Sequence, residues 1–163
     1  MLVLGIDPGT AITGYGLVRE DEQGLVLVAC GTVTTPAGEP LPLRLKTIYA
    51  GLAAVIREHQ PDQAAVEELF FSRNVRTALA VGHARGVALL AVADAGLPVF
   101  EYKPLEVKQA ITGYGGADKS QIQEMVRMLL NLERVPQPDD AADAVAVAVC
   151  HVHSARMRAL IQE

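Results

Sequence analysis

The sequence predicts an α/β domain whose five-stranded sheet mixes antiparallel and parallel strands and is flanked by α-helices. Three β-rich runs follow one another near the start of the chain, and two later runs each come after a helix-length apolar stretch. Short turns join antiparallel strands, whereas a helix between two strands allows a parallel crossover. Because half of its 163 residues are apolar, the chain can bury one sizeable core, and we expect residues 1–163 to form a single domain.

Nine segments carry a pattern of regular structure. The strand-like runs lie at residues 2–6, 14–18, 25–33, 63–67 and 97–102. The helix-like stretches lie at about residues 42–59, 74–95, 118–129 and 140–157. Pro61 stops the first of these helices, and Gly96 closes the second. Asp118 is expected to cap the third, with Gln121 as its capping-box partner.

The last of these segments is ambiguous, because AVAVAV alternates as a strand does. Its length, its alanine content and its position after Pro136 and Pro138 favour a helix. That helix would be apolar on nearly every side and therefore buried.

Charge and composition limit the class of protein without identifying it. The net charge of −5 argues against a nucleic-acid partner, but residues 73–127 hold seven basic and five acidic residues, so a basic face can coexist with the acidic total. Cys30 and Cys150 are too few for a disulfide framework. The chain has no uninterrupted apolar run of membrane-spanning length and no secretory pattern at its start, so we expect a cytoplasmic protein without a membrane partner.

Four carboxylates stand out because each follows or interrupts apolar sequence: Asp7, Glu67, Asp140 and Asp143. Asp7 and Glu67 end strands, and the other two lie three residues apart on one helix face. A buried carboxylate needs a hydrogen bond, a cation or a metal ion. If the strands are neighbours and the helix crosses their ends, the four acids converge on a site for two Mg²⁺ or Mn²⁺ ions, which can support phosphodiester hydrolysis.

Neighbouring residues qualify this hypothesis. Asp140 could instead cap its helix, although Asp139 is the more natural cap. Glu68 is expected to be a solvent-facing neighbour of Glu67. Gly14 and Gly16 would let a bound group approach the backbone beside Asp7 closely.

Several long motifs follow one another over nearly the whole chain: GIDPGTAITGYG, LPLRLKTIYAGL, AVEELFFSRN, ARGVAL, VFEYKPLEVKQA, DKSQIQEMVRMLL and DDAADAVAVAVCHVH. Together they resemble the RuvC family of bacterial Holliday junction resolvases. The resemblance implies a ribonuclease-H-like fold. It also implies a metal-dependent homodimer that nicks two opposing strands of a four-way DNA junction, leaves 5′-phosphate and 3′-hydroxyl ends, and works with the RuvA and RuvB branch-migration complex.

The resemblance also implies roles for particular residues. The family's catalytic acids fall on Asp7, Glu67, Asp140 and Asp143, and its basic residues fall on Lys108 and Lys119, which would hold phosphates. An exposed aromatic of the family falls best on Phe70, with Phe71 as the alternative, and could stack on an unpaired base.

Two further features suggest contacts with DNA or with a second copy of the chain. Arg73 and Arg76 stand at a helix start, where cations are unfavourable, and so could serve a phosphate or remain solvated. Gly82 and Gly86 give the same helix a flat strip. That strip would suit the family's dimer contact or packing on the protein's own sheet.

Other functions remain as alternatives. The turn GIDPGT resembles the phosphate-binding turn of actin-type ATPases, but those proteins need a second copy that is absent here. His151, His153 and Cys150 make a poor zinc set, because the two histidines point in different directions on a helix. A catalytically inactive junction-binding protein, or a ribonuclease-H-like nuclease acting on another branched substrate, stays open.

Overall fold

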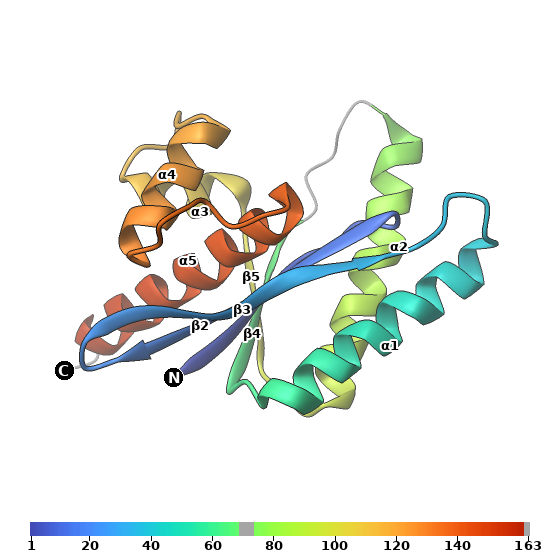
Figure 1. Cartoon of the computed structure of the whole chain (residues 1–163), viewed down its shortest axis with the longest axis horizontal. Coiled ribbons are helices and arrows are strands. Elements are labelled where there is room, and N and C mark those ends of the chain that lie inside the picture. The colour runs from blue at the N-terminus through green and yellow to red at the C-terminus, as the bar shows by residue number, and fades with distance from the viewer. Residues whose placement is uncertain (69–73, 162–163) are drawn as a thin grey trace.

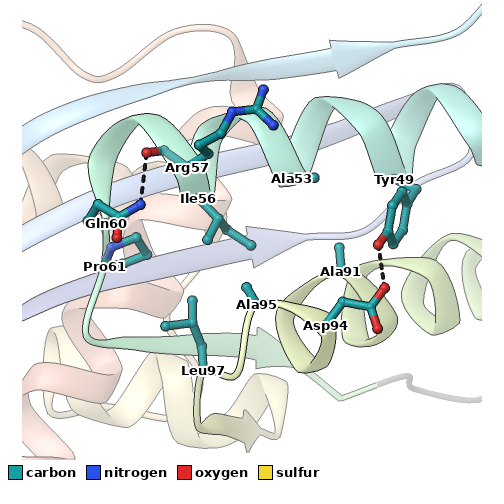
Figure 2. A pocket seen from close by; sticks show the side chains of 10 residues that line it. All are labelled: Tyr49, Ala53, Ile56, Arg57, Gln60, Pro61, Ala91, Asp94, Ala95 and Leu97. Atoms are coloured by element: carbon teal, nitrogen blue, oxygen red, sulfur yellow. Dashed lines mark hydrogen bonds between the residues drawn. The ribbon is translucent and has the colours of Figure 1, made fainter.

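The computed structural model describes residues 1–68 and 74–161 (Figure 1). The strands are β1 (Leu2–Asp7), β2 (Ile12–Asp21), β3 (Gly24–Thr34), β4 (Gln63–Glu67) and β5 (Val99–Tyr102). The helices are α1 (Leu41–His59), α2 (Val75–Asp94), α3 (Pro104–Thr112), α4 (Lys119–Leu129) and α5 (Asp139–Ile161).

The strands form one sheet in the order β3-β2-β1-β4-β5. β1 pairs antiparallel with β2, and β2 with β3, as expected for strands joined by short turns. β4 runs parallel to both β1 and β5, because α1 and α2 carry the chain back across the sheet before each parallel strand. This arrangement confirms the predicted mixed sheet and places β1 at its centre.

Alternating side chains give the sheet two apolar faces. Leu4 and Ile6 of β1 point into a core shared with α1 and α2, whereas Val3 points into a second core shared with α3, α4 and α5. Figure 1 shows α1 and α2 on one side of the sheet, and α5 with α3 and α4 on the other. Asp7 is an even number of residues from Val3, so its side chain faces the layer that contains α5.

Helix α5 is the centre of the second layer. Its residues from Ala144 to Val152 are all buried, which confirms the predicted buried helix. By length and composition, both α5 and α2 could span a membrane, but half of the most apolar window of α5 is buried in the protein. Apolar residues of α5 therefore pack in the core, whereas the most apolar window of α2 is only 22% buried.

The capping box of α4 is also confirmed. The Asp118 carboxylate accepts from the Gln121 backbone N–H at 2.9 Å, and the Gln121 side chain accepts from the Asp118 N–H at 2.8 Å. Helix α3 was not predicted. It begins at Pro104, and the Glu106 side chain accepts from the Lys103 N–H at 2.7 Å, so its start signals were present in the sequence.

Candidate active site

Two of the four predicted carboxylates lie at the same end of adjacent strands. Ile6 pairs with Val66 in the parallel β1–β4 ladder, so Asp7 and Glu67 each follow directly at the carboxyl end of their strands. Glu67 is two residues beyond Ala65, which faces the α5 layer, and therefore points to the same side as Asp7. Both residues are partly buried.

Glycines on β1 and β2 bring the first turns of α5 onto this end of the sheet. Gly14 pairs with Asp7, and a Cβ atom added at Gly14 would lie 1.9 Å from the backbone oxygen of Asp140. A Cβ atom added at Gly5 would lie 2.0 Å from the backbone oxygen of Ala144. Helix α5 of the chain itself therefore makes the close approach expected at Gly14. This contact brings Asp140 and Asp143 toward Asp7.

The electrostatics of Asp7 show that the other three acids lie close enough to act on it. Burial, followed by the negative charges of Asp143, Glu67 and Asp140, raises the pKa of Asp7 from 3.8 to about 7. Burial and Asp143 also raise the pKa of Glu67. The site therefore carries an excess of negative charge at the edge of the core.

Two lysines reduce this charge. Burial raises the pKa of Asp143. The Lys119 Nζ donates to the Asp143 carboxylate at 3.1 Å, and its positive charge opposes that rise and the rise in the pKa of Asp7. Lys108 of α3 opposes the rise in the pKa of Glu67. Both lysines predicted from the sequence thus lie within electrostatic reach of the acids.

The donor set has the chemistry of a divalent-cation site, but its ligands are not preassembled. Within residues 1–68 and 74–161, no three acidic, histidine or cysteine side chains are grouped closely enough to hold a metal ion. Carboxylate oxygens are nevertheless the ligands that Mg²⁺ and Mn²⁺ prefer, and a cation would offset the repulsion that Asp7 experiences. The four residues therefore fit such an ion in their donor chemistry.

The remaining predicted site residues divide into two groups. Phe70, Phe71 and Arg73 lie outside the described residues. Arg76 is exposed in the first turn of α2, whose N-cap is the Asn74 side chain.

The prediction that Asp139 caps α5 is wrong. Asp139 lies within the first turn of the helix, where it pairs with Lys119 at 3.3 Å. Glu68, the neighbour of Glu67, is partly buried.

The histidines of α5 serve packing and hydrogen bonding. His151 is fully buried, and its two ring nitrogens lie 2.6 Å from the Tyr102 hydroxyl and 2.6 Å from the Gln63 side-chain oxygen. The Nε2–H donates to Gln63, which leaves Nδ1 to accept from Tyr102. The Nδ1 atom of His153 lies 3.1 Å from the Ala110 carbonyl oxygen. These contacts agree with the rejection of a zinc site.

The family model described as crossover junction endodeoxyribonuclease RuvC matches residues 3–151 of the chain. The chain belongs to the RuvC family. The crossover junction endodeoxyribonuclease RuvC of Chloroflexus aggregans is 64% identical over 155 residues, which cover 95% of this chain and 94% of the relative. The resemblance seen in the sequence motifs is thereby confirmed.

Solved structures agree with this assignment. The structure of Thermus thermophilus RuvC in complex with a Holliday junction substrate is 40% identical, with a TM-score of 0.91 over 96% of each chain. The yeast mitochondrial Holliday junction resolvase Ydc2 shares only the fold, at 13% identity and a TM-score of 0.67, over 93% of this chain and 77% of its own. The predicted ribonuclease-H-like fold class is confirmed.

Proposed function

We propose that this protein is a metal-dependent endonuclease that resolves four-way DNA junctions by paired, symmetric nicks during recombination and repair. The observation that carries the proposal is the convergence of Asp7, Glu67, Asp140 and Asp143 at one end of the sheet, in a chain of the RuvC family. The products would carry 5′-phosphate and 3′-hydroxyl ends.

Each acid would act as a ligand for Mg²⁺ or Mn²⁺, with two ions in each site. When bound, these ions supply an activated water and stabilise the leaving oxygen of the phosphodiester. A bound cation would offset the repulsion that Asp7 receives from the other three acids. Asp140 and Asp143 would be held in place by the contact between α5 and Gly14.

The basic residues beside the acids would bind the DNA backbone. Lys108 and Lys119 lie within electrostatic reach of the carboxylates, so a phosphate held by either lysine would lie beside the site. Arg73 and Arg76 would extend this contact toward the start of α2, and Phe70 would stack on a base at the junction centre. These three roles rest on the sequence and on the family.

A homodimer would suit a junction with two-fold symmetry, because two sites would then cut opposing strands. Helix α2 offers a surface for it. Val75, Leu79 and Leu90 are 69%, 58% and 54% exposed and lie at helical spacing on one stripe. A Cβ atom added at Gly86, on the same stripe, would meet nothing within 4 Å, so that glycine does not pack on the protein's own sheet.

A dimer-specific substitution tests this surface. Leu79→Glu places two like charges at the proposed contact and should convert the dimer to a monomer, as measured by light scattering after gel filtration. Leu105→Glu is the matched control, because Leu105 is similarly exposed, at 54%, but lies on α3. A Leu79→Glu protein that remains dimeric would exclude the α2 stripe.

The main test compares cleavage of a synthetic four-way junction with cleavage of a linear duplex of the same sequence, in Mg²⁺, in Mn²⁺ and in chelator. We expect paired nicks on the junction only, and we expect Asp7→Asn to abolish them while junction binding persists. Tight binding without nicks would favour an inactive junction-binding protein. Faster cutting of a flap or a three-way junction would favour a nuclease for another branched substrate.

Cellular context is part of the same proposal. Action on chromosomal DNA would place the protein in the cytoplasm, and the family's association with RuvA and RuvB would supply the branch-migration motor. Co-purification of this protein with RuvA and RuvB on junction DNA would test that partnership.

A further inference from the structure

Lys119 has two carboxylate partners, and only one of them belongs to the four-acid site. Its Nζ atom lies 3.1 Å from Asp143 and 3.3 Å from Asp139, which are one helical turn apart on α5. The ammonium group therefore bridges the two acids, and α4 is tied to the start of α5 through its first residue.

Asp139 is prepared for this contact by a second side chain. The Gln123 Nε2 atom, one turn beyond Lys119 on α4, donates to the Asp139 carboxylate at 3.3 Å. Asp139 is thus directed at α4 from the first turn of α5, and its side chain, which is 60% exposed, lies on the outer side of the site, whereas that of Asp143 is only 35% exposed.

The two partners place Lys119 in competition with any cation at Asp143. An ammonium group that holds Asp143 must leave that carboxylate before the carboxylate can bind a divalent ion. If Asp143 were the sole anchor, Lys119 would lose its place beside the site in the same step. Asp139 offers a carboxylate to which Lys119 is already joined.

We infer that Asp139 is a positioning residue: it retains Lys119 beside the active site when the Asp143 carboxylate binds a divalent cation. This inference rests on the proposed metal site. Asp139 lowers the cost of releasing Asp143, because Lys119 moves from a shared contact to one remaining carboxylate and does not have to move into solvent.

The test is a double-mutant cycle on Mn²⁺ affinity, measured by calorimetry or by electron paramagnetic resonance in the absence of DNA. Asp139→Asn should weaken Mn²⁺ binding by about 3- to 5-fold, the range expected for an exposed ion pair, because Lys119 then holds Asp143 alone. In a Lys119→Gln background the same substitution should change the affinity by less than about 2-fold. Asp139→Glu keeps the carboxylate and should bind Mn²⁺ with the parental affinity.

Two controls separate this effect from simpler ones. Glu133→Gln removes an exposed negative charge shortly before α5 and should leave Mn²⁺ affinity unchanged in both backgrounds. Thermal midpoints report whether Asp139→Asn acts by loosening the start of α5, which would weaken binding equally with and without Lys119.

The outcomes distinguish this inference from the proposed function. An Asp139→Asn effect of the same size in both backgrounds, or no effect in either, overturns the role of Asp139 and leaves the nuclease proposal intact. A parental protein that binds no Mn²⁺ and cleaves no junction in Mn²⁺ overturns both.

Discussion

Replacing Gly14 with alanine should damage catalysis more than stability. The added Cβ atom would lie 1.9 Å from the backbone oxygen of Asp140, whereas ordinary contact begins at 3.4 Å, so the first turn of α5 must retreat by about 1.5 Å. A displacement of about 1 Å at a catalytic group can cost roughly 100-fold in rate. We therefore expect Gly14→Ala to slow junction cleavage at least about 100-fold, with a loss of about 1–3 kcal/mol in the free energy of unfolding.

The assay is single-turnover cleavage of a four-way junction in Mg²⁺, with junction binding and urea unfolding measured on the same preparation. Binding should persist, because the substitution displaces carboxylates and removes none of the basic side chains on α3 and α4. Gly38→Ala is the matched control, because a Cβ atom there would meet nothing within 4 Å. A folded Gly14→Ala protein that cleaves within about twofold of its parent would refute the placement of α5 as the determinant of site geometry.

Three further predictions concern stability. Asp7→Asn removes a carboxyl group whose pKa rises from 3.8 to about 7 on folding. In chelator the substitution should therefore raise the free energy of unfolding by up to roughly 4 kcal/mol above pH 7 and very little at pH 4. Equal increases at both pH values in urea unfolding would contradict this. Burial and the charge of Arg158 lower the pKa of His151 to about 4, so the unfolded chain takes up the proton first as the pH falls. Between pH 7 and pH 5 the free energy of unfolding should drop by about 2 kcal/mol through this group. A His151→Gln variant whose free energy of unfolding keeps the same pH slope would argue against this. Asp118→Ala should lower the free energy of unfolding by about 1 kcal/mol through loss of the α4 cap, and an unchanged urea midpoint would count against that cap.

Features encoded locally could be predicted from the sequence. The strands follow from short apolar runs, and the α4 cap follows from Asp118 and Gln121 at the required spacing. Asp7 and Glu67 could be singled out because a charge directly after a buried strand needs a reason. Helix α3 was missed because it is only nine residues long and buries just Val107 and Ile111, too few positions to define a helical period.

Contacts between distant segments could not be predicted from local patterns. Gly14 indicated that some group approaches the backbone closely, but not that α5 is the element that packs against it. Asp139 had the sequence position of a helix cap, yet its carboxylate instead meets Lys119, which is 20 residues earlier in the chain. Nothing in the spacing of these two residues specifies the angle at which α4 crosses the start of α5.

Because α5 follows all five strands in the chain, the proposed site cannot form until residues 139–161 have been synthesised. This helix supplies two of the four acids and a large share of one apolar core, and it packs against the central strands β1 and β2. A polypeptide interrupted before residue 139 would lack both the acids and that core. Under the proposed function, ribosome-bound or truncated products without this helix would be unable to incise DNA, and the cell would be protected from a nuclease that had not finished folding.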